Sequence, residues 1–231
     1  MEQQLTLGTV LVTGGASGLG RAVAAAVREA GGTPVVLDVN DAPGFDTEIV
    51  DLSDTRAAEA AVTRAATRHG GIDAVVTAAG VDRPAPLATL PGPEWERIIG
   101  VNLLGTAAVI RSCLSNKHLS PNARIVTVAS TLGLSVAADA TAYCASKWGV
   151  VGFTRALATE LKGQVGVTLL IPGGMDTAFF DGRDDQYKPP PDAKLASPAD
   201  VARAVVFALS QPPGLELREL VVTASEEGSW P

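Results

Sequence analysis

The sequence has few of the residues that bind metals or form disulfides, because its 231 residues include only two cysteines and two histidines. Cys113 and Cys144 show no metal-ligand spacing, so we predict no metal site and expect a reduced, cytoplasmic setting. The first residues, MEQQLTLG, lack the basic and then apolar pattern of a signal peptide, which favours the same location.

The sequence also lacks an excess of positive charge and a long apolar run. Its 18 lysines and arginines face 25 acidic residues, and the net charge of −7 argues against nucleic acid or an anionic membrane as the main partner. No run approaches the roughly 18 apolar residues that cross a bilayer. The chain shows no internal linker and no short-period repeat, and 46% of its residues are apolar. We therefore expect a single domain over residues 1–231 with a large core.

Strand-like apolar runs alternate with helix-like runs along the chain. The expected strands are 9–13, 34–38, 48–51, 74–78, 124–129, 167–171 and 219–223. The expected helices are 19–30, 54–68, 93–115, 141–161 and 198–210, with Ser53 and Ser197 as the N-caps of the second and the last. Several strands are apolar on successive residues, which is typical of a parallel sheet covered on both faces. The alternation predicts a doubly wound α/β fold, whose ligands bind at the carboxyl ends of the strands.

One segment, residues 176–194, breaks this alternation. It carries Asp181, Asp184 and Asp185 and three consecutive prolines at 189–191. Because it is longer than an ordinary connection between a strand and a helix, we predict a mobile lid over a site. The alternative is a disordered insertion at the surface.

The glycine-rich stretch TGGASGLG, residues 13–20, stands between an expected strand and an expected helix. Such a turn presents backbone N–H groups and the positive end of a helix to an anion, which suits the pyrophosphate of a dinucleotide. Glycines allow positive φ angles and a close approach of the phosphate. The alternative is a plain strand-to-helix turn. The residues expected around the cofactor here are Gly14, Ser17, Gly18, Leu19 and Gly20.

Acidic residues end the next two expected strands. Asp38 follows Gly20 by 18 positions, where a carboxylate can accept hydrogen bonds from both hydroxyls of the adenosine ribose. The same carboxylate would repel a 2′-phosphate, so the sequence predicts NAD(H) rather than NADP(H). Asp51 and Leu52 end the third expected strand and are candidates for the edge of the adenine site. The alternative for each acidic residue is a simple turn role.

Tyr143 and Lys147 are four residues apart on an expected helix, so they share one face. A phenol titrates near 10, and a neighbouring ammonium would lower its pKa, so that Tyr143 could take a proton from an alcohol or give one to a ketone. Ser130 closes an expected strand and could hold the substrate oxygen. Asn102 lies inside an expected long helix, where Asn is unfavourable, and predicts a local kink that holds a water beside Lys147. Each of the four also has a plain structural alternative.

Together these residues resemble the short-chain dehydrogenase/reductase family, in its compact single-domain branch, over nearly the whole chain. TGGASGLG matches the family's TGxxxGxG turn, and Asn102, Ser130, Tyr143 and Lys147 match its catalytic tetrad. The resemblance implies a Rossmann-type doubly wound parallel sheet of seven strands in the order 3-2-1-4-5-6-7, with helices on both faces. It also implies hydride transfer with Tyr143 as acid or base, Lys147 on the nicotinamide ribose, and Asn102 in a proton relay.

The resemblance also implies further cofactor contacts. Pro172-Gly173 and Thr177 match the family's PGxxxT segment, whose threonine contacts the nicotinamide carboxamide, and Ala79 and Gly80 belong to the turn TAAG. The family usually has an asparagine where this chain has Thr77; we expect Thr77 to make some of the same bonds between strands. By the same resemblance the chain forms a homodimer or homotetramer, with Trp148 near the interface.

The sequence therefore predicts an NAD(H)-dependent oxidoreductase that interconverts a secondary alcohol and a ketone on a small or hydrophobic molecule. One alternative is a 3-oxoacyl-thioester reductase or 3-hydroxyacyl dehydrogenase; another is a non-catalytic protein that senses dinucleotides. We find no paired arginine or lysine that would plainly clamp an anionic substrate. The expected substrate pocket is apolar and is lined by Val81, Leu132, Leu134, Val136, Met175, Phe179 and Phe180.

Overall fold

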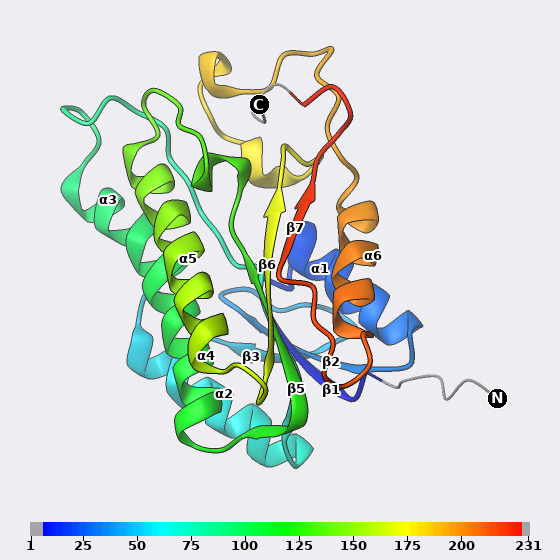
Figure 1. Ribbon diagram of the computed structural model, residues 1–231. Helices are drawn as coiled ribbons and strands as arrows, with labels where there is room; N and C mark the ends of the chain where they lie inside the picture. The colour runs from blue at the N-terminus through cyan, green and yellow to red at the C-terminus, as the bar shows by residue number, and fades with distance from the viewer. Residues whose placement is uncertain (1–6, 228–231) are drawn as a thin grey trace.

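The computed structural model describes residues 7–227, and over these residues seven strands form one parallel sheet (Figure 1). The order is β3-β2-β1-β4-β5-β6-β7, which confirms the predicted topology. The strands are β1 (Thr9–Thr13), β2 (Thr33–Asp38), β3 (Asp46–Ile49), β4 (Ile72–Thr77), β5 (Leu119–Val128), β6 (Gly166–Pro172) and β7 (Glu219–Val222). The order reverses between β1 and β4, and a sheet of this kind places its ligand site at that point.

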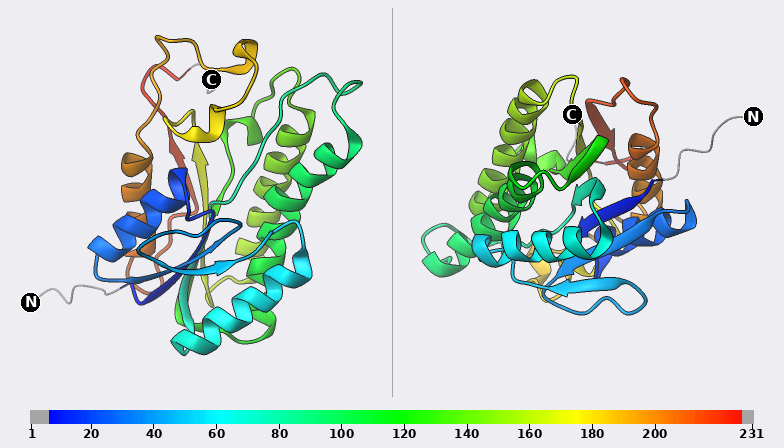
Figure 2. Two further views of the ribbon diagram at one scale, coloured as in Figure 1. Left: turned by 180° about the vertical axis from the view of Figure 1, so that it is seen from behind. Right: turned by 90° about the horizontal axis from the view of Figure 1, so that it is seen from below.

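The helices cover both faces of the sheet, as predicted (Figure 2). The α-helices are α1 (Gly18–Glu29), α2 (Thr55–His69), α3 (Gly92–Ile99), α4 (Thr106–Ser115), α5 (Thr141–Glu160) and α6 (Pro198–Leu209). The short helical turns are η1 (Gly100–Gly105), η2 (Thr131–Gly133), η3 (Ala178–Phe180) and η4 (Asp185–Tyr187). Helices α1 and α6 pack through Val23 and Val205 against one face, where Val10 and Val12 of β1 point. Helices α2, α4 and α5 pack against the other face, where Leu11 points. Burial of alternate strand residues on opposite faces thus makes two cores.

Two local expectations are corrected by the structure. Strand β3 begins and ends two residues earlier than predicted, because Thr47 and Glu48 pair with β2. This edge strand is half polar, and Glu48 accepts hydrogen bonds from arginines of α2, so its apolar pattern was weak. Helix α2 is capped by Asp54 rather than Ser53, since the Asp54 carboxylate accepts from the N–H groups of Arg56 and Ala57.

The long helix predicted over 93–115 is interrupted where Asn102 lies. Helix α3 passes into the π-helical turn η1 and then into α4, and Asn102 is fully buried in η1. The predicted local irregularity is therefore present, as a π-helical turn of the kind that often marks functional sites. Of the described residues, only the stretch Gly92–Ser115 is long and apolar enough to cross a membrane, with a mean hydropathy of 1.6. Since 61% of that window is buried inside the protein, we interpret it as a core helix.

The segment 176–194 connects β6 to α6 above the carboxyl ends of the strands (Figure 1). It contains both η3 and η4, and two of its side chains bond to other loops. Arg183 pairs with Asp82 in the connection from β4 to α3, and the Tyr187 hydroxyl donates to Asp139 in the connection from β5 to α5. The segment is thus held over the end of the sheet where a ligand would bind.

Candidate active site

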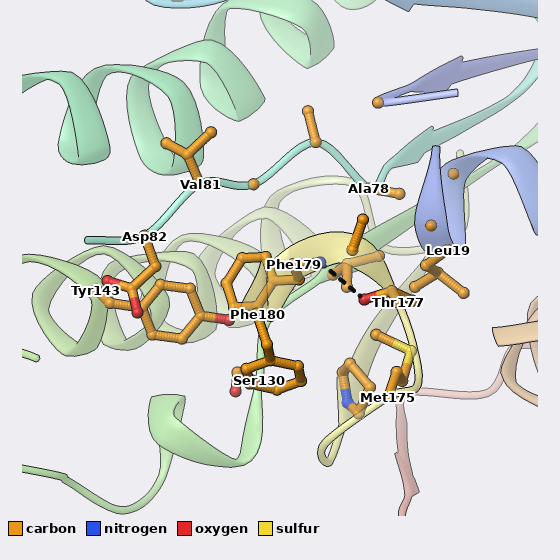
Figure 3. Close-up of a pocket in the computed structure, with 18 of the residues that line it drawn as sticks. Leu19, Ala78, Val81, Asp82, Ser130, Tyr143, Met175, Thr177, Phe179 and Phe180 are labelled. Atoms are coloured by element: carbon orange, nitrogen blue, oxygen red, sulfur yellow. Dashed lines mark hydrogen bonds between the residues drawn. The ribbon is translucent and has the colours of Figure 1, made fainter. Parts of the chain in front are cut away.

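A cavity of about 890 Å³ lies at the carboxyl ends of the strands. The sequence-predicted residues that line it are Gly14, Ser17, Gly18, Leu19, Gly20, Asp38, Asp51, Leu52, Ala79, Gly80, Ser130, Tyr143, Lys147, Pro172, Gly173 and Thr177. Ten of the lining residues on the substrate side and around the glycine turn are labelled in Figure 3. The fold therefore brings the separate motifs of the sequence to one cavity.

The glycine turn approaches the neighbouring backbone too closely for side chains. Gly14 has φ +73°, and a Cβ placed there would lie 2.7 Å from the Cα of Ala79; a Cβ at Gly20 would lie 2.2 Å from the carbonyl oxygen of Gly14. Helix α1 begins directly after this turn, and the Ser17 side chain makes no capping hydrogen bond to it. The first N–H groups of α1 thus face the cavity without a side-chain cap, which fits the pyrophosphate of a dinucleotide.

Asp38 stands at the end of β2 beside the glycine turn. Its carboxylate accepts hydrogen bonds from the N–H groups of Ala16 (3.0 Å) and Asn40 (2.9 Å), so two backbone groups fix its orientation. Asp51 lies at the next strand end and accepts from the N–H and hydroxyl of Ser53, at 2.9 and 2.8 Å. Both acidic residues line the same cavity as the glycine turn.

Tyr143 lies in the first turn of α5, and Ser130, which follows β5, lines the same cavity. Burial raises the pKa of Tyr143 to about 12, although Ser130 and the charge of Arg183 oppose that rise. Tyr143 is therefore protonated at neutral pH. This corrects the expectation that Lys147 lowers the pKa of the free protein: its Nζ lies 5.6 Å from the centre of the Tyr143 ring. At that distance desolvation of the phenolate outweighs the attraction of the ammonium.

Lys147 is 4% exposed, and its Nζ donates to the carbonyl oxygen of Val128 at 2.9 Å. Burial lowers the pKa of Lys147 to about 8, against the opposing influence of Asp82. The Nζ and the Oδ1 of Asn102 lie 3.6 and 3.7 Å from the point where a Cβ of Gly80 would be. Lys147 and Asn102 thus converge over Gly80.

The side chain of Asn102 holds other residues in place. Its Oδ1 accepts from the N–H of Val81 at 2.8 Å, and its Nδ2 donates to the carbonyl of Val81 and to the hydroxyl of Ser146. The Ser146 hydroxyl in turn donates to the carbonyl oxygen of Tyr143 at 2.7 Å. Asn102 therefore links the turn after β4 to the helix that carries Tyr143. Ser146 was not predicted from the sequence, where its only signal is its place one residue before Lys147.

Two further predictions concern residues beside this network. Thr77 is buried, and its hydroxyl has no hydrogen-bond partner within residues 7–227, so the expectation that it bonds between strands is wrong. The hydroxyl of Thr13 accepts from the N–H of Ala79 at 3.0 Å instead, and ties β1 to the turn after β4. The hydroxyl of Thr177 accepts from the N–H of Phe179, and its methyl group lies against Gly18.

Five of the seven apolar residues predicted to line the substrate pocket line the cavity. They are Val81, Leu132, Met175, Phe179 and Phe180. Leu134 and Val136 are not among its lining residues, because Leu134 packs against another core cluster and Val136 is 76% exposed.

A charged pair that was not predicted from the sequence lies on the substrate side of the cavity. The Nη2 of Arg183 lies 3.1 Å from the Oδ2 of Asp82, and the two side chains are 11% and 6% exposed. Both residues line the cavity, and the Phe179 ring lies 5.7 Å, centre to centre, from that of Tyr143 (Figure 3). No sequence spacing pointed to the pair, since its members are 101 positions apart.

Comparison with known proteins agrees with this geometry. Residues 8–188 match the family described as short chain dehydrogenase. A cis-4-hydroxycyclohexanecarboxylate dehydrogenase of Sinomonas cyclohexanicum is 33% identical over 87% of this chain and 88% of its own. A (2S)-[(R)-hydroxy(phenyl)methyl]succinyl-CoA dehydrogenase subunit of Thauera aromatica is 34% identical over 85% and 87%.

A solved structure is also similar. The 3-ketoacyl-(acyl-carrier-protein) reductase of Brucella melitensis, complexed with NADH, superposes with a TM-score of 0.81 at 26% identity, over 94% of this chain and 97% of its own. The protein therefore belongs to the short-chain dehydrogenase family, as an NAD(P)-dependent oxidoreductase that acts on CH–OH groups.

Proposed function

We propose that the protein interconverts a secondary alcohol and a ketone on a compact, largely apolar substrate, with NAD(H) as cofactor. The observation that carries this proposal is that Tyr143, Ser130 and Lys147 line one cavity together with the glycine turn and Asp38. A proton donor, an oxygen-binding hydroxyl and a dinucleotide cradle are the parts that such a reaction needs.

In this mechanism the Tyr143 hydroxyl moves the proton and Ser130 orients the substrate oxygen. The dinucleotide, when bound, supplies the acceptor or donor of hydride, and the positive charge of its oxidised ring favours the Tyr143 phenolate. In the direction of reduction, Tyr143 starts in the protonated form that its raised pKa favours and gives its proton to the ketone oxygen. Lys147 contributes a cation beside Tyr143 and would hold the nicotinamide ribose. Asn102 acts as a positioning residue, because its side chain bonds hold Val81 and Ser146.

The preference for NAD(H) rests on the orientation of Asp38. Two backbone N–H groups hold its carboxylate at the strand end where the adenosine ribose would lie. A 2′-phosphate there would face a fixed negative charge. Fluorescence titration with NADH and NADPH tests this assignment, and tighter binding of NADPH would refute it.

A second candidate is reduction of 3-oxoacyl thioesters. It is favoured by the likeness to the 3-ketoacyl reductase structure and by the largely apolar lining of the cavity around Phe179 and Phe180. A panel of simple alcohols, ketones and acyl thioesters, followed by the absorbance of reduced nicotinamide, separates the two candidates. Tyr143→Phe is the matched inactive control, and a wild-type protein that binds cofactor but turns over nothing would support the dinucleotide sensor instead.

We also propose a lid role for residues 176–194, a cytoplasmic location, a single domain, and a homodimer or homotetramer. The oligomer is supported by Trp148 of α5 and Leu104 of η1, which are about half exposed (48% and 50%). Large apolar side chains left exposed on adjoining helices favour burial against another copy. Light scattering coupled to size-exclusion chromatography measures the mass, and a monomer at micromolar concentration would contradict this proposal.

A further inference from the structure

Arg183 lies in an unusual setting on the substrate side of the cavity. Its guanidinium carbon is 4.7 Å from the centre of the Phe179 ring and 4.8 Å from that of Phe180, so both rings flank it. One Nη2 pairs with Asp82 at 3.1 Å. The Nε–H is buried and has no hydrogen-bond partner within the described residues. A buried guanidinium donor without a partner is rare in native proteins and calls for a specific explanation.

Arg183 is also close to the proposed reaction centre. Phe179, on which it stacks, is in contact with the Tyr143 ring, and the charge of Arg183 favours the Tyr143 phenolate and so acts to lower the pKa of Tyr143. A substrate whose hydroxyl or ketone oxygen lies at Tyr143 and Ser130 occupies the same cavity that Arg183 lines. The part of the substrate beyond the reacting carbon can therefore contact the Arg183 side chain, which lines the cavity.

The charges of this region favour an anion as the missing partner. Arg183, Asp82 and Lys147 form a cluster with two cations and one carboxylate, and both cations act on the pKa of Asp82. Lys147 keeps its charge at neutral pH, since its pKa is about 8. The cluster therefore carries one excess positive charge in surroundings with two phenyl rings, where a hydrogen bond to a charged group is strong.

We propose that Arg183 is a specificity-determining residue whose Nε–H binds a carboxylate of the substrate, so that the protein acts on short hydroxy acids and their oxo acids. This inference rests on the proposed function for the position of the reacting carbon. The competing interpretation is that the Arg183–Asp82 pair only fastens the segment 176–194 to the connection after β4. In that case loss of either partner would have the same effect on every substrate.

The binding part of the proposal is tested without turnover. Protein saturated with NADH, which cannot oxidise an alcohol, is titrated with 3-hydroxybutyrate, mandelate and 3-hydroxycyclohexanecarboxylate, and with the methyl ester of each. The readout is the ¹⁵Nε–H NMR signal of Arg183, assigned by its loss in Arg183→Lys. We expect at least one acid, and no ester, to shift this signal in a saturable way. A signal that no acid moves, or that acid and ester move equally, overturns the proposal.

Steady-state kinetics then distinguish two roles of Arg183: an anchor that binds the substrate carboxylate, and a fastener that only attaches the segment 176–194 to the connection after β4. We expect Arg183→Gln to lower kcat/KM for the best hydroxy acid by about 30-fold and for its ester by less than about 3-fold, as for a lost hydrogen bond to a charged group. Asp82→Asn should keep or raise kcat/KM for the acid, because it removes the competing carboxylate. Equal losses in both variants, on acid and ester alike, would identify a fastener and refute the anchor.

Two controls keep failures distinguishable. Lys188→Gln removes the exposed ion pair with Asp185 on the same segment and should leave kcat/KM unchanged for both the acid and its ester. Tyr143→Phe should abolish turnover yet keep the Arg183 signal shift. If the wild-type protein turns over no alcohol or ketone, the proposed function fails, while the NMR titration still decides the role of Arg183.

Discussion

The cofactor end and the substrate end of the cavity are built in different ways. The cofactor end consists of strand ends and the glycine turn, where backbone groups within short motifs set the geometry, as at Gly14 and Asp38. The substrate end is assembled from side chains of three separate connections, through pairs such as Arg183–Asp82 and Tyr187–Asp139. The first end is therefore suited to one constant ligand, and the second can change its ligand by substitution of a few side chains.

The largest expected effect falls on Tyr143, where the two ends meet. Tyr143→Phe removes the hydroxyl that lies in the cavity with Ser130 and should lower kcat by at least about 10³-fold, in the range of lost general acid–base catalysis. Because the ring still packs on Phe179, the Kd for NADH should stay within about 3-fold of the wild-type value. Steady-state kinetics and fluorescence titration measure the two quantities. Retained turnover would exclude the acid–base role.

A pair of glycine substitutions compares the two ends directly. Gly14 and Gly182 both have positive φ angles, of +73° and +72°, but a Cβ at Gly14 would meet Ala79, whereas a Cβ at Gly182 has nothing within 4 Å. Gly182→Ala should lower the free energy of unfolding by roughly 1 kcal/mol, the strain of the left-handed conformation. Gly14→Ala adds a backbone clash and should lower it by about 3 kcal/mol, with loss of NADH binding. Denaturant unfolding measures both, and equal losses would mean that the turn relaxes freely.

The same contrast explains what the sequence could predict. Strand order, the glycine turn and the irregular helix at Asn102 follow from local patterns and from a family resemblance, and the structure has all three. The Arg183–Asp82 pair joins positions 101 apart, and no local spacing reveals it. Leu134 and Val136 were misplaced because the turn after Ser130 directs them away from the cavity, which an apolar pattern does not show.

At the cofactor end of the cavity, a smaller effect is expected on the preference between NADH and NADPH. Asp38→Asn removes the negative charge and keeps one of the two acceptors, because Ala16 and Asn40 donate to different oxygens of the carboxylate. The Kd for NADPH should fall by roughly tenfold, since a fixed like charge no longer faces the 2′-phosphate, while the Kd for NADH changes little. The Asp51→Asn variant is the matched control, because that carboxylate is held by Ser53 at the next strand end. An unchanged preference in Asp38→Asn would remove Asp38 from cofactor discrimination.

The smallest expected effect concerns Lys147, which lies between the two ends. Burial holds its pKa at about 8 in the folded protein, below the 10.5 of a free lysine, so the unfolded chain binds this proton more tightly. Its contribution to stability therefore rises as pH increases from 8 to 10.5, and below pH 8 the buried ammonium costs free energy. At pH 7 the free energy of unfolding of Lys147→Met should accordingly be higher than that of the wild type by roughly 1 kcal/mol, as measured by urea denaturation. The difference in free energy of unfolding between variant and wild type should shrink by pH 10. A variant that is less stable than the wild type at every pH would show that the hydrogen bond to Val128 outweighs the cost of burying the charge.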